Sequence, residues 1–266
     1  MPMSLLVKAA PGREICEITP ERAGWTHVGF RALRLAAGDH ETLDTGTREL
    51  CLVVLTGTVE VQVGDTVFAG LGSRDSVFAE QSPDALYVPG GRMLTITATR
   101  DSEVALCSAP SKGGKAVRRI DGSTMRRSVR GKGSNTRYVC DILPQDDPTA
   151  DHLLVVEVIT PAGHSSSYPP HKHDRDVPPE ETLLEETYYH RLNPPQGFAF
   201  QRVYTDDRSI DEACAVENHD VVMVPRGYHP CVAPHGYDLY YLNVMAGPGR
   251  LWHFKNDPAH EWMVGL

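Results

Sequence analysis

The sequence has no long hydrophobic run and no closely spaced cysteine pair. None of its 266 residues lies in a stretch approaching the roughly 18 consecutive apolar residues of a membrane-spanning helix. The apolar run after Met1 is too short for a secretory signal. We therefore expect a cytoplasmic protein with no membrane partner. We also expect six reduced, structural thiols, at Cys16, Cys51, Cys107, Cys140, Cys214 and Cys231.

Excess positive charge is also lacking. The chain has 26 Lys and Arg residues against 35 Asp and Glu residues, a net charge of -9, which argues against a nucleic-acid partner. Residues 112–137 differ, with nine basic residues and one acidic residue, so this segment carries +8 and the rest of the chain -17. Either it is a Gly-rich solvated linker lying against acidic surface, or one of its arginines reaches an anionic substrate.

Short β-prone runs separated by turn residues occur on both sides of the basic segment. Residues 50–64 contain Thr56-Gly57 as a turn, and a similar pattern restarts at residue 152. Residues 87–91 (YVPGG) resemble residues 223–227 (MVPRG), which indicates an internal duplication. The prediction is an all-β protein with few helices. It has two tandem barrels, residues 1–111 and 138–266, joined by a basic linker at 112–137.

Histidine is scarce in the first half, because ten of the twelve histidines lie beyond residue 150. His171 and His173 are separated by one residue, so on an extended strand both point to the same face. Glu186 opens a β-prone run, and His229 follows a Pro-Gly turn. Three imidazoles and one carboxylate suit one divalent ion such as Zn²⁺, Mn²⁺ or Fe²⁺. With Asn243 after them, their order resembles the paired motifs of the cupin superfamily.

Two departures from the cupin pattern affect the expected site. Twelve residues, 174–185, separate the second histidine from Glu186, which leaves Glu185 as the second choice of acid and Glu180 or Glu181 as weaker ones. The insertion is polar and is expected to act as a lid or as a partner contact. In the first half Glu49 precedes a strand but no His-x-His stands before it, so we expect no metal there.

Longer segments carry a closer resemblance. The segments SSSYPPHKHD, LEETYYHR, GFAFQRVYTDDRSIDEA, ENHDVVMVPRGYHP, GYDLYYLNVMAGPGR and WHFKNDPAHEW resemble the 5-deoxy-glucuronate isomerase family, and less closely 4-deoxy-L-threo-5-hexosulose-uronate ketol-isomerase. The resemblance implies a bicupin of double-stranded β-helix type with a metal site in the second barrel. It also implies conversion of 5-deoxy-D-glucuronate to 5-dehydro-2-deoxy-D-gluconate in myo-inositol catabolism.

That reaction needs a proton carrier and a cation for the substrate carboxylate. Tyr188, His190 and Tyr241 flank the expected ligands, and the sequence does not choose among them or a metal-bound hydroxide. For the carboxylate, Arg202 is the first choice, ahead of Lys172 and Arg226. Whether the reaction proceeds through an enediol or a hydride shift stays open.

Two other functions are compatible with the same ligands. One is an Fe(II) cupin dioxygenase, which predicts a mostly apolar, aromatic-lined pocket. The other is a non-catalytic sugar-binding cupin, which predicts an exposed or incomplete metal site. The expected partner in the main prediction is a small sugar acid. The subunit number is left open, with a homo-oligomer as one alternative.

Overall fold

The computed structural model describes residues 4–264, which form two compact units. Unit 1 comprises Met1–Ala9, Arg127–Cys140 and Val156–Leu266, and unit 2 comprises Ala10–Arg126 and Asp141–Val155. Residues 112–137, predicted as a linker, are divided between the two units. They contain β11 (Arg118–Ile120) and β12 (Arg126–Arg130), and β11 is hydrogen-bonded to β8 (Asp84–Val88).

Unit 2 is built on two antiparallel sheets. In the described residues one sheet has the strand order β11-β8-β5-β10-β3-β2, and the other has the order β4-β9-β6-β7. Its remaining strands are β2 (Glu14–Ile18), β3 (Gly29–Leu35), β4 (His40–Asp44), β5 (Arg48–Thr56), β6 (Val59–Val63), β7 (Thr66–Leu71), β9 (Met93–Ala98) and β10 (Ser102–Pro110). Its one α-helix among the described residues is α1 (Pro20–Ala23).

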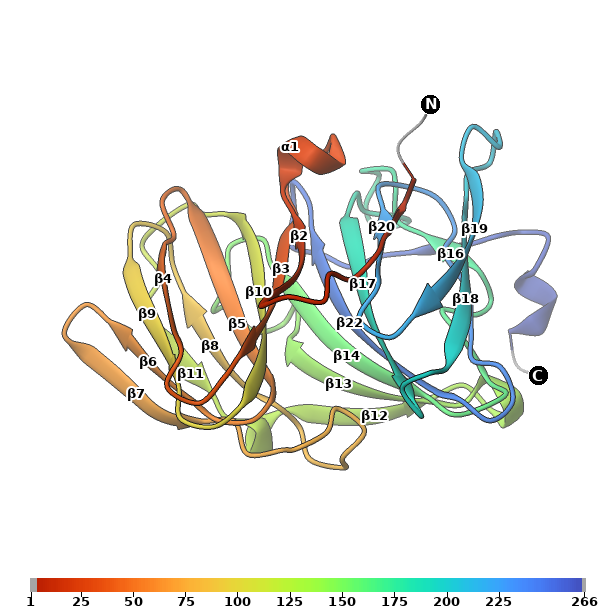
Figure 1. Cartoon of the computed structure of the whole chain (residues 1–266). Helices are drawn as coiled ribbons and strands as arrows, with labels where there is room; N and C mark the ends of the chain where they lie inside the picture. The colour runs from red at the N-terminus through yellow and green to blue at the C-terminus, as the bar shows by residue number, and fades with distance from the viewer. Residues whose placement is uncertain (1–3, 265–266) are drawn as a thin grey trace. The chain divides into compact units, whose positions relative to one another are not determined.

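Unit 1 contains the larger sheet, with the order β1-β20-β17-β22-β14-β13-β12, and a smaller sheet of order β15-β21-β18-β19 (Figure 1). A short pair, β16 and β23, completes its strands among residues 4–264. The bounds are β1 (Leu6–Val7), β13 (Arg137–Leu143), β14 (Leu154–Thr160), β15 (Ser165–Ser166), β16 (His171–Lys172), β17 (Glu185–Asn193), β18 (Phe198–Tyr204), β19 (Asp211–Glu217), β20 (Val221–Val224), β21 (Cys231–Val232), β22 (Asp238–Ala246) and β23 (Lys255–Asn256). Helical structure elsewhere is limited to short 3-10 turns at Gly122–Thr124, Gly133–Asn135 and Glu261–Met263.

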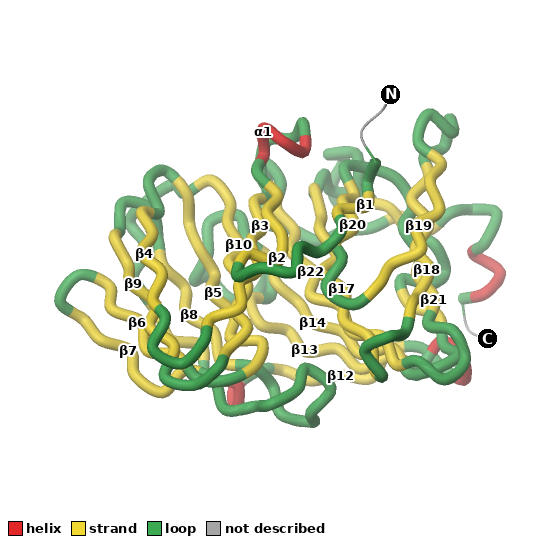
Figure 2. Tube along the Cα trace, viewed as in Figure 1, coloured by secondary structure: helices red, strands yellow, loops and turns green. Residues whose placement is uncertain are grey.

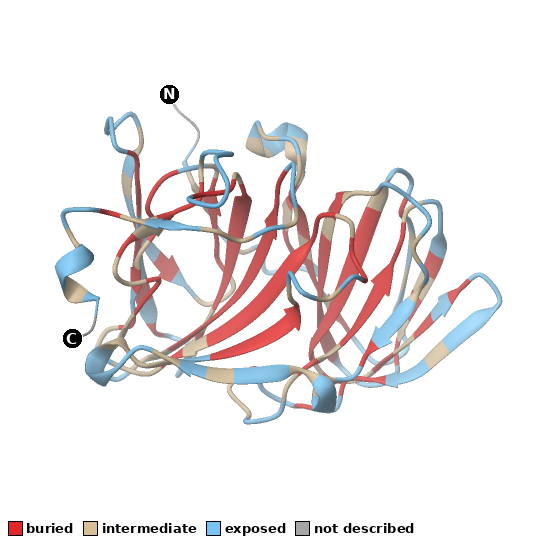
Figure 3. Cartoon of the chain, turned by 180° about the vertical axis from the view of Figure 1, so that it is seen from behind, coloured by how far each residue is buried: buried red, intermediate tan, exposed pale blue. Residues whose placement is uncertain are grey.

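The strands follow the period of two that a half-buried sheet requires. In β6 and β18 buried and exposed residues alternate, whereas the central strands β5 and β17 are buried along most of their length (Figure 3). The predicted turn at Thr56-Gly57 is present, and Gly57 has φ +85°, a conformation that favours glycine. Loops connect nearly all of these strands (Figure 2), which confirms the all-β prediction.

The same strand order occurs in both units. β5 lies between β8 and β10 in unit 2, and β17 lies between β20 and β22 in unit 1. The two similar sequence motifs, YVPGG and MVPRG, stand at the ends of the corresponding strands β8 and β20. The arrangement supports the internal duplication.

The first strand of the chain belongs to the sheet of unit 1. β1 pairs antiparallel with β20, with Leu6 opposite Val222 and Val7 opposite Val221. Figure 2 shows the two strands beside each other. All six cysteines are buried, and none of them forms a disulfide. Among the described residues no helix is long and apolar enough to cross a membrane.

Candidate metal centre

The His-x-His pair lies on the short extended segment that begins with β16. Backbone pairing of His171 with Asn256 of β23 holds this segment extended, so His171 and His173 share one face and Lys172 takes the other. Lys172 is buried on that other face and forms an ion pair with Asp174, with 2.7 Å between Nζ and Oδ1. Asp174 also accepts a hydrogen bond from the Gly227 amide at 3.0 Å, which ties this segment to the loop that carries His229.

The other two predicted ligands come from the central sheet and from the loop after β20. Glu186 is the second residue of β17 and lies opposite Val224 of β20 in the backbone register. His229 stands five residues after Val224, where its Nδ1–H donates to the Gly227 carbonyl at 2.8 Å. Sheet pairing and the loop hydrogen bond therefore bring both side chains to the His-x-His pair.

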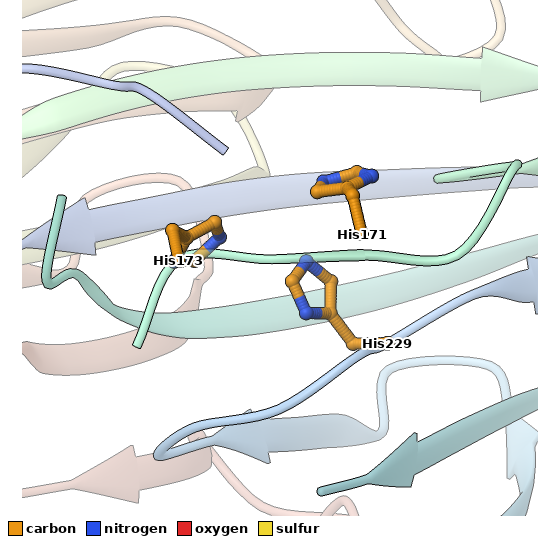
Figure 4. A group of neighbouring side chains, drawn as sticks. All are labelled: His171, His173 and His229. Atoms are coloured by element: carbon orange, nitrogen blue, oxygen red, sulfur yellow. The ribbon is translucent and has the colours of Figure 1, made fainter. Parts of the chain in front are cut away.

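The four side chains converge on one point. Figure 4 shows the three imidazole rings facing one another, His171 and His173 on one segment and His229 on another. One ring nitrogen from each lies within 4.8 Å of the others. Glu186 Oε2 lies 3.1 Å from His173 Nε2 and 3.2 Å from His229 Nε2.

The protonation of the histidines suits a cation. Burial lowers the pKa of His171 and of His229 to about 3, so both imidazoles are neutral at pH 7. Burial alone would also lower the pKa of His173, but the hydrogen bond and charge of Glu186 outweigh it and raise the value. Within residues 4–264 the buried His229 Nε2 makes no hydrogen bond of good geometry, as expected of an atom whose partner is a metal. The donor set therefore fits one divalent ion.

Hydrogen bonds also orient the side chains of His173 and Glu186. His173 Nδ1–H donates to the Leu184 carbonyl at 3.0 Å, which leaves Nε2 directed at Glu186. The Asn243 side-chain amide donates to Glu186 Oε1, so the other carboxylate oxygen, Oε2, is the one that faces the histidines. Asn243 therefore has a positioning role that the sequence motif indicated only by its order.

The centre forms part of a cavity of about 240 Å³ in unit 1. His171, Glu186 and Asn243 line it together with polar and apolar side chains from several strands and from the segment after residue 250. The other lining residues are Arg130, Arg137, Val139, Val156, Val158, Ser167, Tyr168, Pro169, Tyr188, Tyr241, Trp252, Phe254, Asn256 and Val264. A cavity lined by both polar and apolar side chains beside a cluster of possible metal ligands is typical of a small-molecule site.

Two of the three predicted proton carriers line this cavity. The Tyr188 hydroxyl is 2.9 Å from Ser167 Oγ, and the Tyr241 hydroxyl is 2.6 Å from Ser166 Oγ. Burial raises the pKa of both tyrosines well above the usual value. His190 does not line the cavity, because it lies beyond Tyr188 with its Nε2 2.9 Å from Gln201 Oε1.

None of the three cations predicted to bind the substrate carboxylate lines the cavity. Arg202 lies on the exposed face of β18, where Nε and Nη2 donate to both carboxylate oxygens of Asp211. Lys172 points away from the histidines, and Arg226 is exposed with Nη2 3.2 Å from Ser209 Oγ. The arginines in the cavity are Arg130 and Arg137, which belong to the basic segment noted in the sequence.

In the inserted residues 174–185, Glu181 is buried, whereas Asp176 and Glu180 are exposed. Glu181 accepts hydrogen bonds from the backbone amides of Asp174 and Arg175 and lies 3.8 Å from Lys172. Asp174 and Glu181 therefore both contact Lys172. No cavity-lining residue comes from the loop.

In unit 2 the Glu49 carboxylate binds the backbone of residues 151–153. Its oxygens accept hydrogen bonds from the backbone amides of Asp151, His152 and Leu153, each at 2.7 Å, and from the Tyr87 hydroxyl at 2.8 Å. These four donors hold the carboxylate in a structural role.

Comparison with known proteins identifies the relatives of this chain. The model of the KduI/IolB family matches residues 5–263. The 5-deoxy-glucuronate isomerase of Halalkalibacterium halodurans is 52% identical over 248 residues, covering 93% of this chain and 92% of that protein. The 5-deoxy-glucuronate isomerase of Bacillus subtilis is 48% identical over 269 residues, covering 98% and 99%.

Solved structures are also similar to this chain. An IolB-like protein from Salmonella typhimurium superposes with a TM-score of 0.97 at 49% identity, covering 99% of this chain and all of that one. The oxalate decarboxylase of Bacillus subtilis has a TM-score of 0.66 at 13% identity, covering 100% of this chain and 82% of that one, a likeness of fold that confirms the bicupin prediction. The chain therefore belongs to the KduI/IolB family and, as its curated relatives indicate, is an isomerase.

Proposed function

We propose that this isomerase converts 5-deoxy-D-glucuronate into 5-dehydro-2-deoxy-D-gluconate in myo-inositol catabolism, with one divalent ion of Zn, Mn or Fe. The observation that carries the proposal is the convergence of His171, His173, Glu186 and His229 at the wall of a cavity that also presents two tyrosine hydroxyls. The names of relatives about 50% identical over nearly their whole lengths support the substrate.

The reaction moves hydrogens without net oxidation. The substrate aldehyde at C1 becomes a hydroxymethyl group, and the C2 hydroxyl becomes a ketone. One hydrogen leaves C2 and one is added at C1, while the hydroxyl proton passes from O2 to O1. A bound divalent ion would act as a Lewis acid on the two oxygens and acidify the C2–H bond. The imidazoles of His171, His173 and His229 and the Glu186 carboxylate would hold that ion, and their roles as ligands leave the proton transfers to other side chains.

Tyr188 and Tyr241 supply protons at the oxygens. Because burial keeps both phenols protonated at neutral pH, each donates a hydrogen bond toward a substrate oxygen and does not act as a resting base. Ser167 and Ser166 orient the two hydroxyls. The His190 ring stacks on the Tyr188 ring, with 5.9 Å between the ring centroids, and so supports the position of this tyrosine.

The test is turnover of synthetic 5-deoxy-D-glucuronate by purified protein, followed by NMR. We expect the ketose to form, a chelator to stop the reaction and one equivalent of divalent metal to restore it. Substrate deuterated at C2 separates the two routes, since exchange with solvent indicates an enediol and retention at C1 a hydride shift. Oxygen consumption coupled to substrate loss would favour the dioxygenase, and binding without turnover would favour the sugar-binding protein.

A further inference from the structure

Two arginines bring positive charge into the cavity of the metal centre. Arg130 is the last residue of β12 and Arg137 the first of β13, so the hairpin between these strands delivers both side chains. Arg130 lies over the ring of Trp252, with 5.6 Å between its guanidinium carbon and the ring centroid. The only acid that lines the cavity within residues 4–264 is Glu186, which is directed at the histidines.

Arg137 has no acidic partner among residues 4–264. Its hydrogen bonds run from Nη1 to the backbone and side-chain oxygens of Asn135, at 3.0 and 3.1 Å. Burial lowers its pKa, and the neighbouring charge of Arg130 acts in the same direction. Burying part of a guanidinium without an acidic partner costs free energy unless an anion accepts its remaining hydrogen bonds.

The hairpin fixes this guanidinium in place. Gly131 has φ +77°, and a Cβ atom there would lie 2.7 Å from Arg137 Nη1 and would also collide with the Asn135 carbonyl. Asn135 Nδ2 donates to the Tyr168 carbonyl at 2.9 Å, and His164 Nδ1 donates to the Thr136 carbonyl at 2.9 Å. Arg137 is therefore held at the cavity wall before any ligand arrives, as a preorganised binding group requires.

We propose that Arg137, with Arg130 beside it, forms the carboxylate subsite of this cavity and selects sugar acids over neutral sugars. A guanidinium binds a carboxylate through parallel N–H donors, and its Nε and Nη2 groups are not engaged by any described residue. The subsite rests on the proposed function for its substrate. It orients the acid with its carboxylate at the hairpin and its aldehyde end at the histidines.

The kinetic test compares Arg137→Met with the wild type on 5-deoxy-D-glucuronate and on the neutral aldose that carries a hydroxymethyl group in place of the carboxylate. We expect kcat/KM for the acid to fall at least about 100-fold, and that for the neutral aldose to change less than about threefold. Arg137→Lys should recover part of the loss. Arg202→Met tests the rival assignment, and a carboxylate-dependent loss there would overturn ours.

A binding test does not depend on turnover. Calorimetry with methyl glucuronoside and methyl glucoside, which differ in the carboxylate and are not isomerised, should show that the wild type prefers the acid and that Arg137→Met does not. Metal content measured on the same samples should be equal. A wild type that turns over neither substrate but keeps this Arg137-dependent preference would retain the subsite and refute the proposed function. An equal loss on acid and neutral compounds, or an unchanged preference in the variant, would refute the subsite.

Discussion

Lys172 and Asp174 form a buried ion pair on the face of the His-x-His segment that points away from the metal centre. Asp174 in turn accepts the Gly227 amide, and Lys172 Nζ lies 3.0 Å from Asp206. Replacing Lys172 with Met removes the cation that pairs with Asp174, so we expect a loss of about 2 to 4 kcal/mol in the free energy of unfolding and weaker metal retention. Urea unfolding and metal analysis measure both. The matched control is Lys255→Met, an exposed lysine on the paired strand, with an expected change within about 0.5 kcal/mol.

The metal ligands give a second prediction. His173→Ala and Glu186→Gln should each abolish retention of the ion while the far-ultraviolet circular dichroism stays unchanged, because the sheets do not depend on these side chains. Glu185→Gln should keep the metal, since adjacent residues of β17 face opposite sides of the sheet. Elemental analysis of dialysed protein decides the point, with the exposed His235→Ala as control. One equivalent of metal retained by both ligand variants would contradict the assignment.

The cavity tyrosines are expected to affect kcat. Tyr188→Phe and Tyr241→Phe each remove a protonated hydroxyl, and we expect kcat to fall about 100-fold or more with little change in metal content. Tyr189 is the matched control because it follows Tyr188 on β17 and its hydroxyl bonds His219 at 2.6 Å outside the cavity. If Tyr189→Phe lowers kcat as much as Tyr188→Phe does, the loss reflects packing and not proton transfer.

Gly131 and Gly133 form a matched pair on the β12–β13 hairpin. Both have positive φ, at +77° and +53°, but a Cβ atom would collide with neighbours only at Gly131. Gly131→Ala should therefore displace Arg137 and raise KM for the sugar acid about tenfold or more, whereas Gly133→Ala carries only the cost of its backbone conformation. Steady-state kinetics on both variants measure the difference, and equal KM values would exclude the displacement.

His190 predicts a pH dependence of stability. Burial lowers its pKa to about 4 from the usual 6.5, so the unfolded chain binds the proton more tightly than the folded one. The stability from this group is complete above about pH 6.5 and is lost as the pH falls toward 4, by about 3 kcal/mol at most. The free energy of unfolding of His190→Gln, measured from pH 7 to 4.5, should fall less steeply than that of the wild type. Parallel curves would remove His190 as the cause.

Much of the metal centre was predictable because local rules govern it. The spacing of His171 and His173 sets their common face, and the turn before His229 ends a strand that pairs with β17. Glu186 is preferred over Glu185 in the sequence because it opens the β-prone run ETYYHR as the acid does in the cupin motif, and the geometry around the histidines supports that choice.

The strand that carries Arg202, β18, has apolar residues on both faces. Phe198 and Phe200 point outward with Arg202, while Ala199 and Val203 are buried, so the sequence pattern did not reveal which face lies inside. Arg137 reaches the cavity through hydrogen bonds between Asn135 and Tyr168 and between Thr136 and His164, contacts between residues distant in the sequence. The sequence shows the basic segment at residues 112–137, but its pattern does not indicate which of its nine basic side chains enters the cavity.

The pairing of β1 with β20 has a consequence for synthesis on the ribosome. Leu6 and Val7 leave the exit tunnel long before their partners Val222 and Val221 are translated, because the paired residues lie far apart in the sequence. Until then the nascent chain carries β1 without its partner. A gene divided between the two sequence repeats would therefore encode a C-terminal fragment whose main sheet lacks an edge strand encoded in the other fragment.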